Sequence, residues 1–571
     1  MKATNICLAL ISSLFCISAV CAQQQRSSPN TRSVTDQAAQ PSTADAKAVE
    51  GPTLLSYDEI IQLYQQDTPP APLLDKLNRL LTTPFVSNQA SHSGVRSLKP
   101  SSPQTGKFLR VALWNIERGL EFDAVRLAFT DPQKFSALMD EKKSRASADE
   151  RAHIIDQVNV LRQADVLVFN EVDWGMNRTL FRNVAAELAG ALEMNYAYGV
   201  EFVEVDPVTM GIDEQVVLRE VKDAYAEPNE SKAEMIEHIK QIMKPDPARY
   251  RGLHGTAILS RYPLENVRLI PFKFQGHDWY ADEKRKVSGL AKVEGKLSAD
   301  VFKEQLVRQV RRGGRMMLMA EIVDNDLPSG RVTIVATHLE DLTTPLNRRK
   351  QLEELLYQIK NINNPVIVAG DMNTSTHDAA PLSVKRALKQ RFGSAKWWAE
   401  AGVFEAVSQA TPFGWAYDVS RRVIGLARGA DDPTVRSIPL ISGNPEAAFF
   451  TTLEKYRFAD GNAFDFRGMR ARTSNGRAGN LADSNERAEK GFVPTSELGR
   501  TFGPIGKYKL DWIFVRPVRL TDPHDTRQSY RFAPHFGRTL KELNQSIPER
   551  ISDHNPITVD LPLEEPPSLP K

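Results

Sequence analysis

Residues 348–374 read RRKQLEELLYQIKNINNPVIVAGDMNT, a helical pattern followed by a strand pattern that ends in polar residues. Four apolar residues recur at the i, i+3, i+4, i+7 spacing of one helix face: Leu352, Leu355, Leu356 and Ile359. This spacing predicts a helix over 348–362. The run Val366–Ala369 then predicts a buried strand, and Asp371 and Asn373 follow it. Such a strand delivers its polar end residues to one edge of a sheet.

Short apolar runs of the same kind recur along the chain, separated by amphipathic helical patterns. The runs are Leu109–Trp114, Val166–Phe169, Ala257–Leu259, Met316–Ile322, Val332–Ala336, Val366–Ala369, Trp512–Val515 and Ile557–Leu561. Runs of this length that end in polar residues are typical of buried strands. We therefore expect a mixed α/β fold whose central strands are buried under helices.

Polar side chains suited to metal or phosphate chemistry stand at the ends of these runs or just beyond them. They are Asn115, Glu171, His338, Asp371, Asn373, Asp511, Asp553 and His554. A lone histidine or aspartate beside a strand is usually a structural or capping group. Their joint occurrence at strand ends, which a sheet brings together, instead indicates one functional site.

The oxygen donors in this set suit a hard divalent cation such as Mg²⁺ or Mn²⁺. Such an ion is held by one or two carboxylates and keeps water molecules for its substrate. We assign Glu171, Asn115 and Asp553 to that role. A cysteine-containing zinc site is not expected, because all three cysteines lie within residues 1–22, a segment predicted to be removed. A Gly-rich Walker loop is absent from the sequence.

The other residues of the set suit an attack of water on phosphorus. Asp371 would orient and deprotonate the water, with the Asn373 amide holding the geometry. His338 and His554 would supply positive charge where negative charge develops. A histidine does this reliably only if an acceptor fixes its other nitrogen, and Asp511 is the predicted partner of His554.

The N-terminus has the pattern of a secretory signal peptide. The apolar run from Ile6 to Val20 is shorter than a membrane-spanning helix, so we expect cleavage after Ala22 and a secreted or periplasmic chain. The expected organisation is a signal peptide (1–22), a disordered linker (23–52), a helical or extended segment (53–106), a main domain (107–563) with insertions near 205–250, 276–313 and 377–506, and a tail (564–571).

The charge balance bears on binding partners. The 571 residues carry a formal net charge of +2, so no global field would draw the protein to a nucleic-acid backbone or an anionic membrane. Any recognition of phosphate must therefore be local.

The motifs occur in an order that resembles the endonuclease/exonuclease/phosphatase superfamily, which includes pancreatic-type deoxyribonuclease, abasic-site endonucleases, bacterial sphingomyelinases and inositol polyphosphate phosphatases. The resemblance rests on Asn115, Glu171, GTAILSRYP at 255–263, Thr337-His338-Leu339, Gly370-Asp371-Met372-Asn373, Leu510-Asp511-Trp512 and Ser552-Asp553-His554. It implies a four-layer α/β sandwich, with two packed mixed sheets flanked by helices. It also implies a Mg²⁺-dependent phosphoesterase site at one end of the sheets.

The resemblance also implies roles for single residues. Asn115 and Glu171 match the family's metal ligands, and Asp553 matches the acidic residue beside the metal. Asp371 and Asn373 match the pair that activates water and contacts phosphate. The remaining matches are His554 with the catalytic histidine, Asp511 with its carboxylate partner, and His338 with the histidine that nuclease members place on the phosphate.

The substrate is a separate question, and basic residues near the motifs favour nucleic acid over phospholipid. These are Arg308, Arg311, Arg312, Arg315, Arg348, Arg349 and Lys350. Arg315 also resembles an arginine that some family members aim at the substrate, the alternative being a solvated loop arginine.

Two further hypotheses stay open. A phospholipase C or sphingomyelinase would need an exposed apolar hairpin. The candidates Trp397-Trp398 and Phe449-Phe450 are each only two residues long, and we interpret them as core packing. A catalytically inactive binding protein is the third hypothesis, and the presence of every metal and histidine position opposes it.

Overall fold

The computed structural model describes the chain in several segments. They are residues 50–103, 105–206, 210, 246–285, 309–375, 432–436, 444–467, 484–488, 491–497, 507–525, 527–528, 531–533, 536–548 and 550–564. The predicted signal peptide, nearly all of the predicted linker and of the predicted tail, and most of each predicted insertion near 205–250, 276–313 and 377–506 lie outside these segments. No helix within them is long and apolar enough to cross a membrane.

The first of two large sheets has nine strands and mixed direction. Its order along the main path is β1 (Phe85–Ser87), β5 (Asn195–Glu204), β6 (Leu253–Ser260), β4 (Val166–Trp174), β3 (Gly106–Arg118), β16 (Ile557–Pro562) and β15 (Phe536–Thr539). Beside this path, β2 (Ser101–Ser102) pairs with β3 and β8 (Arg311–Gly313) pairs with β5. Strands β3 and β4 are parallel and the other pairs are antiparallel.

The second large sheet has five strands and is also mixed. Its order is β14 (Asp511–Arg516), β11 (Val366–Asp371), β10 (Arg331–His338), β9 (Met316–Val323) and β7 (Leu264–Pro271). Only β10 and β11 of this sheet are parallel. A separate pair joins β12 (Ser496–Glu497) to β13 (Lys507–Tyr508).

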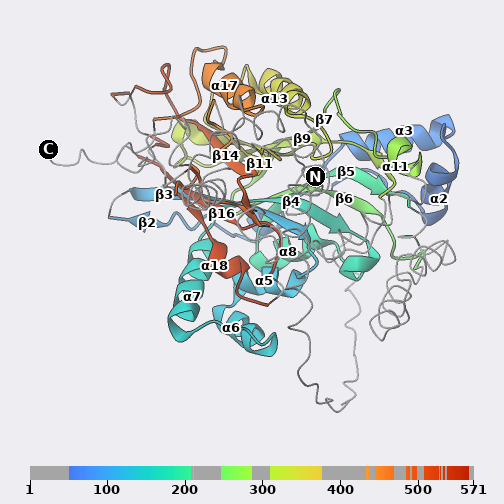
Figure 1. The fold of residues 1–571 in the computed structure, drawn as a ribbon, viewed down its shortest axis with the longest axis horizontal. Coiled ribbons are helices and arrows are strands. Elements are labelled where there is room, and N and C mark those ends of the chain that lie inside the picture. The colour runs from blue at the N-terminus through green and yellow to red at the C-terminus, as the bar shows by residue number, and fades with distance from the viewer. Residues whose placement is uncertain are drawn as a thin grey trace, which may run out of the picture. The chain divides into compact units, whose positions relative to one another are not determined.

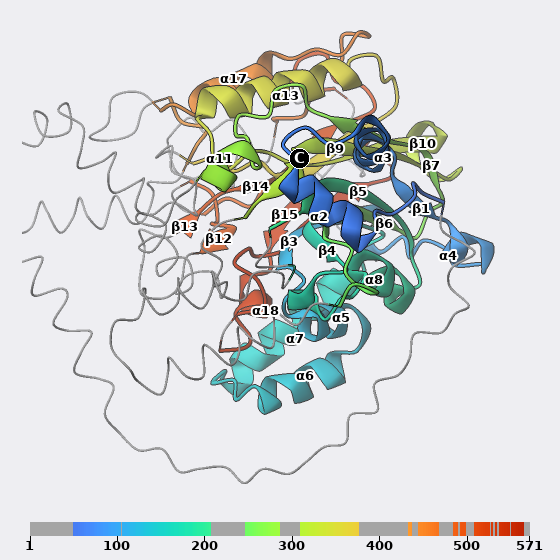
Figure 2. The ribbon, with the colours of Figure 1, turned by 90° about the vertical axis from the view of Figure 1, so that its right-hand side faces the viewer.

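Helices cover the outer face of each sheet, so the domain has four layers (Figures 1 and 2). The first sheet is covered by α5 (Phe122–Thr130), α6 (Pro132–Glu141), α7 (Ala148–Arg162), α8 (Val184–Leu192) and α18 (Lys541–Asn544). The second is covered by α13 (Pro345–Ile359) and α17 (Ala447–Lys455). The other helices are α2 (Tyr57–Gln65), α3 (Ala71–Thr82), α4 (Gln89–His92), α11 (Ala281–Arg285), η2 (Asn177–Thr179) and η3 (Pro328–Gly330). The predicted four-layer α/β sandwich is confirmed.

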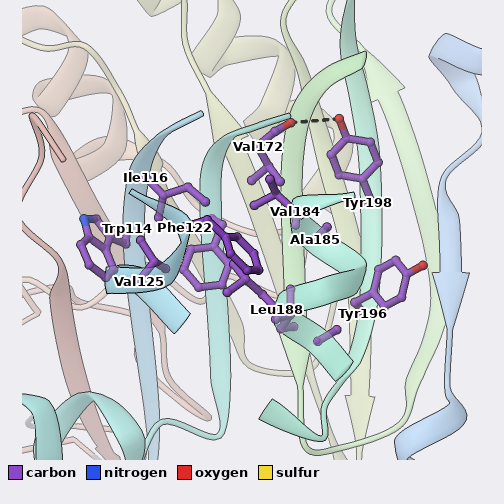
Figure 3. Close-up of a cluster of buried hydrophobic side chains, with 14 of the residues drawn as sticks. Trp114, Ile116, Phe122, Val125, Val172, Val184, Ala185, Leu188, Tyr196 and Tyr198 are labelled. Carbon is purple, nitrogen blue, oxygen red and sulfur yellow. Dashed lines mark hydrogen bonds between the residues drawn. The ribbon is translucent and has the colours of Figure 1, made fainter. Parts of the chain in front are cut away.

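The sheets pack face to face through one apolar layer. It includes Leu109, Val111 and Leu113 of β3, Val332, Ile334 and Ala336 of β10, and Ile367 and Ala369 of β11. Because successive side chains of a strand point to opposite faces, the alternate residues pack on the helices. Figure 3 shows such an outer cluster, in which Trp114 and Val172 lie with Phe122 and Val184 of the helices. Most strands are thus buried on both faces, as their continuous apolar runs predict.

Each of the eight apolar runs lies within an observed strand. The helix predicted over 348–362 begins at Pro345 and ends at Ile359, three residues earlier at both ends. The Thr344 side chain caps it by accepting a hydrogen bond from the Asn347 backbone, and Pro345 suits the first turn. The capping residue therefore determines where the helix begins, which the spacing of apolar residues alone does not predict.

The segment before the sheets forms two helices, as predicted, and is held to the rest of the domain. Ser56 and Glu59 make a capping box at the start of α2. At its other end, Arg312 of β8 donates hydrogen bonds to the carbonyl oxygens of Leu63 and Gln66. This guanidinium satisfies carbonyls that a helix end leaves unpaired, and so joins α2 to the first sheet.

Candidate active site

The candidate site lies where the apolar layer between the sheets ends. Along β3 the inward positions Leu109, Val111 and Leu113 are followed by Asn115. The same change occurs on β11, where Ile367 and Ala369 precede Asp371. In the second sheet Asp371 is paired in register with His338 of β10 and with Asp511 of β14. The ladder thus sets three predicted site residues side by side.

Irregular backbone marks the first sheet at this edge. The β3–β4 pairing shifts between Asn115 and Arg118, and the β4–β6 pairing shifts between Phe169 and Val172. Glu171, inside the second shift, has a φ of 52°, and Asn373 after β11 has a φ of 50°. Bulges of this kind re-aim side chains, and left-handed non-glycine residues concentrate at functional sites. The backbone is bent where the predicted ligands stand.

Asp371 is the centre of the site. Its Oδ2 accepts a hydrogen bond from Asn115 Nδ2 at 3.2 Å and lies 3.6 Å from His338 Nε2 and 3.7 Å from His554 Nε2. Its Oδ1 accepts from the Asn373 backbone N–H at 2.9 Å. Burial raises the pKa of Asp371 to about 7, and the charge of Asp511 adds to this while that of His554 opposes it. A carboxyl with this pKa is poised to take up a proton near neutrality.

His554 lies in contact with Asp511 in this structure. Its Nδ1 lies 2.8 Å from Asp511 Oδ2, which leaves Nε2 directed at Asp371. Burial lowers the pKa of His554, but the carboxylates of Asp511, Asp371 and Asp553 outweigh burial and hold it well above its usual value. The imidazole is therefore protonated at neutral pH and can act as a cation or an acid.

His338 lies beside Asp371 on the neighbouring strand, β10. Its Nδ1 lies 4.0 Å from Glu201 Oε2, beyond hydrogen-bond distance, and has no hydrogen-bond partner among the residues described. Burial lowers the pKa of His338 well below its usual value, and the positive charge of Arg315 lowers it further. His338 is thus neutral, so it can offer a hydrogen bond but no charge, unlike His554.

Arg315, whose charge acts on His338, is only 3% exposed. It donates to Glu201 at 2.8 Å and to Asp341 at 3.2 Å, and its Nε lies 3.6 Å from Glu340. The solvated-arginine alternative is therefore wrong, because the guanidinium is buried among three carboxylates. Its role as a direct substrate contact stays a prediction.

The residues predicted to hold a metal meet at Asn115. Asn115 Nδ2 donates to Glu171 Oε1 at 3.1 Å, and Glu171 is half-buried, so its carboxylate remains reachable from solvent. Asp553, also half-buried, is joined to this group through Ser552, whose hydroxyl donates to the Asn115 carbonyl at 2.7 Å. Asp553 also donates its backbone N–H to Glu117 at 3.0 Å. Asn115 Oδ1 accepts from the Glu117 backbone N–H at 3.2 Å, so Asn115 presents its amide nitrogen to Glu171. The carboxylates of Glu171 and Asp553 and the Asn115 amide oxygen are of the ligand type that Mg²⁺ or Mn²⁺ prefers.

A second group of candidate ligands overlaps the catalytic residues. The ligand atoms of Asp371, Asp511 and His554 all lie within 4.8 Å of one another. However, His554 and Asp511 already share a hydrogen bond, and the carboxylates favour the protonated imidazole. A protonated histidine cannot ligate a metal, so this cluster fits proton transfer better. Asp511 Oδ1 nevertheless lacks a hydrogen-bond partner within the described part of the chain.

Asn373 and Asn170 fix the loops around Asp371. The Asn373 amide donates to the Leu339 carbonyl at 3.0 Å, which ties the segment after β11 to that after β10. Asn170 Oδ1 accepts from the Asp371 backbone at 2.9 Å, and its Nδ2 donates to the Thr337 carbonyl at 3.1 Å. Asn170 thereby joins the two sheets at the site.

Sequence reasoning missed Asn170, Glu201 and Thr256. Thr256 donates to Glu201 Oε1 at 2.6 Å and accepts from Asn170 at 3.0 Å, so the three form one buried chain. Asn170 directly precedes Glu171, and Thr256 lies in the GTAILSRYP motif. Their positions in these motifs could have identified both as site residues. Glu201 lies on β5, whose alternation of Tyr196, Tyr198 and Val200 was the available sign of a strand.

The basic residues predicted to contact phosphate are engaged elsewhere. Arg311 donates to buried Glu204 at 2.6 Å, and Arg312 stacks on the Tyr280 ring. Arg348 is buried in an ion pair with Glu446, Arg349 pairs with Glu353 at 3.1 Å, and the Lys350 ammonium lies 4.5 Å from the centre of the Phe274 ring. Arg308 lies outside the described residues. Arg311 and Arg348 are buried in these contacts and do not support the basic-patch argument for nucleic acid. The pair of Arg349 with Glu353 is partly exposed and contributes little free energy, and Lys350 is exposed, so these two cations remain available to a phosphate.

Comparison with known proteins identifies the family. A family model described as the endonuclease/exonuclease/phosphatase family matches residues 112–554, most of the chain, and the chain belongs to this family. Its members are hydrolases of phosphoester bonds and generally depend on a divalent metal, so the protein is a phosphoesterase of this family. No curated protein matches the chain.

Solved structures also resemble the chain at low identity. An endonuclease/exonuclease/phosphatase from Beutenbergia cavernae is 16% identical, with 81% of this chain and 73% of that one covered and a TM-score of 0.33. A humanized TDP2 from D. rerio is 11% identical, with 79% and 98% covered and a TM-score of 0.30. The human Nocturnin catalytic domain is 12% identical, with 79% and 93% covered and a TM-score of 0.27.

Proposed function

We propose that the protein is a divalent-metal-dependent phosphodiesterase that cleaves nucleic acid. The phosphodiesterase activity in this proposal rests on the placement of one buried carboxylate, Asp371, within 3.7 Å of two histidine Nε2 atoms and in contact with the amide that binds Glu171. Nucleic acid as the substrate is the finer part of the proposal, and the substrate tests below address it. A base (Asp371), a proton donor (His554) and residues with oxygen donors for a metal ion thus lie close together. These are the groups that the attack of water on a phosphodiester requires.

In this mechanism each residue has a defined role. Asp371 takes the proton of the attacking water, and the Asn373 backbone N–H holds its carboxylate in place. Protonated His554, oriented by Asp511, stabilises the negative charge on the phosphate. As the phosphorus–oxygen bond to the leaving group breaks, His554 gives its proton to the leaving oxygen. Neutral His338 donates a hydrogen bond to a phosphate oxygen. A divalent cation held by Glu171, Asn115 and Asp553 would supply further positive charge to those oxygens.

The phospholipase alternative receives no support from the apolar pairs. Phe449 and Phe450 are 1% and 4% exposed, and the Phe450 ring packs 4.8 Å from that of Trp512. Their interpretation as core packing is therefore confirmed. The Trp397-Trp398 pair lies outside the described residues.

Removal of divalent metal should abolish hydrolysis. We expect EDTA to reduce cleavage of bis(4-nitrophenyl) phosphate to background and excess Mg²⁺ or Mn²⁺ to restore it, because the oxygen set needs a hard cation. Calorimetric titration of Mg²⁺ into the protein and into Glu171→Ala measures the binding itself. Full activity in chelator, or equal binding by the variant, would show that the metal assignment is wrong.

We also propose that the protein is secreted or periplasmic, because residues 1–22 have the pattern of a cleaved signal. Expression of the full chain should give a mature N-terminus at Gln23 outside the cytoplasm. N-terminal sequencing of the exported protein checks this. Retention of Met1 would contradict cleavage.

A further inference from the structure

The loop between β4 and α8 presents an exposed apolar side chain on a rigid base. Leu180 is 71% exposed and has a φ of 55°, and Phe181 after it has a φ of 61°. Two successive left-handed residues without glycine are costly, and such strain is kept where the surrounding structure enforces it. Left-handed non-glycine residues of this chain include Glu171 and Asn373 at the candidate active site, and also exposed residues such as Lys143 and Asn266.

Several contacts hold this loop in place. Gly175 N–H donates to the Arg182 carbonyl, and Phe181 N–H donates to the Met176 carbonyl, both at 2.8 Å. Arg178 pairs with Asp173 of β4 at 2.6 Å. The two ends of the loop are also packed, because Val172 before it and Val184 after it belong to one buried cluster (Figure 3). Leu180 is therefore held out by a fixed scaffold.

The loop is close to the candidate active site along the chain. Trp174, only three residues after Glu171, forms a β-bridge with Asn183, which is three residues after Leu180. The path from Glu171 to Leu180 thus consists of three residues, one β-bridge and three more residues. Even if both stretches are fully extended, Leu180 lies no more than about 25 Å from Glu171. At about 3.4 Å per nucleotide, this corresponds to no more than about seven nucleotides of a strand.

Guanidinium groups flank the apolar tip. The Arg249 side chain is 61% exposed and lies over the Phe181 ring at 4.4 Å, and that of Arg182 is 32% exposed. Their ion-pair partners are the nearby residues Asp246 and Glu187, and the Arg182 guanidinium also lies 4.6 Å from the centre of the Phe122 ring. Such exposed pairs contribute little free energy, so these cations can be redirected to phosphates.

We infer that Leu180 is an apolar wedge that contacts the bases of a nucleic-acid strand away from the cleaved phosphate. Small apolar side chains inserted between bases, beside cations that hold the backbone, are a known mode of binding. A single exposed leucine is too small for stable attachment to a bilayer, which needs a larger apolar area or a second anchor. This inference rests on the proposed nuclease function.

Substrate length provides the test. Leu180→Asn keeps a residue that tolerates the left-handed conformation and removes the apolar group. We expect it to lower kcat/KM about tenfold on an oligonucleotide of about 20 nucleotides, the effect of losing one buried leucine contact. On a dinucleotide or bis(4-nitrophenyl) phosphate, neither of which reaches the loop, kcat/KM should stay within about twofold of wild type. Leu346→Asn, at another exposed leucine (54%), is the matched control and should change neither.

Each outcome bears on a different claim. Equal effects of Leu180→Asn on long and short substrates, or none, would overturn the wedge while the nuclease function stands. Cleavage of bis(4-nitrophenyl) phosphate without cleavage of any oligonucleotide would overturn both. Hydrolysis of sphingomyelin vesicles that depends on Leu180 would assign the loop to a lipid surface instead.

Discussion

Asp371→Asn should lower kcat by about 10³-fold on any phosphodiester that the protein hydrolyses. The amide can still accept the Asn373 backbone hydrogen bond, but it cannot take a proton from water. The pKa of Asp371, raised to about 7 by burial, predicts that wild-type kcat falls as the pH drops below about 7. Steady-state rates between pH 5 and 9 measure both effects.

The stability of this variant should change little. Because folding raises the Asp371 pKa, the ionised carboxylate destabilises the folded state above pH 7, and asparagine removes that cost. The new NH2 group faces the Asn115 and His554 donors and offsets this gain, so we expect an unfolding temperature at pH 8 close to that of wild type. Asp560→Asn, which breaks the buried pair with Arg110, is the matched control and should lose stability but keep kcat. If the kcat of Asp371→Asn stays within a few fold of wild type, Asp371 is not the base of the reaction.

His554→Ala should lower kcat by about 10³-fold, because it removes a positioned cation or acid from the phosphate. Asp511→Asn tests the electrostatics more finely. The Asp511 carboxylate raises the pKa of His554, so its loss lowers that pKa and deprotonates the imidazole at lower pH. Since the mechanism needs the protonated form, the alkaline limb of the kcat profile should move to lower pH.

His524→Ala is a control for general loss of a histidine, because His524 lies on the surface in a pair with Glu454. It should leave both kcat and the profile unchanged. An alkaline limb that stays in place in Asp511→Asn would mean that His554 does not act as the protonated group. Circular dichroism of each variant separates these effects from unfolding.

Much of the fold was predictable because its strands are buried on both faces. Runs such as Val366–Ala369 carry a continuous apolar signal, and the observed strands contain them. Strand β5 was missed because its sequence, NYAYGVEFVE, mixes charged residues with aromatic ones. The charged positions are stable there because Glu201 and Glu204 meet arginines from β8 and the start of β9, far away in sequence.

The candidate site was predictable where its residues terminate apolar runs. Asp371 and Asn115 continue an alternation that the core imposes, so their direction follows from the register. The surroundings of Arg315 were not predictable, because its three carboxylate neighbours come from two segments distant in sequence, Glu201 on β5 and the consecutive residues Glu340 and Asp341. The change of strand register at Glu171 was also not predictable, because no residue type in that stretch indicates it.

The ladder that pairs Asp371 with Asp511 has a consequence for the evolution and engineering of this chain. The two aspartates are 140 positions apart in sequence, yet they face each other across adjacent strands. Their separation is set by interstrand hydrogen bonds, whose spacing does not depend on the length of the connection. A change in the length of that connection can therefore leave the reacting groups at the same distances, provided that α17 within it is kept, because α17 packs on the second sheet. A shortened chain that retains α17 is thus a testable design.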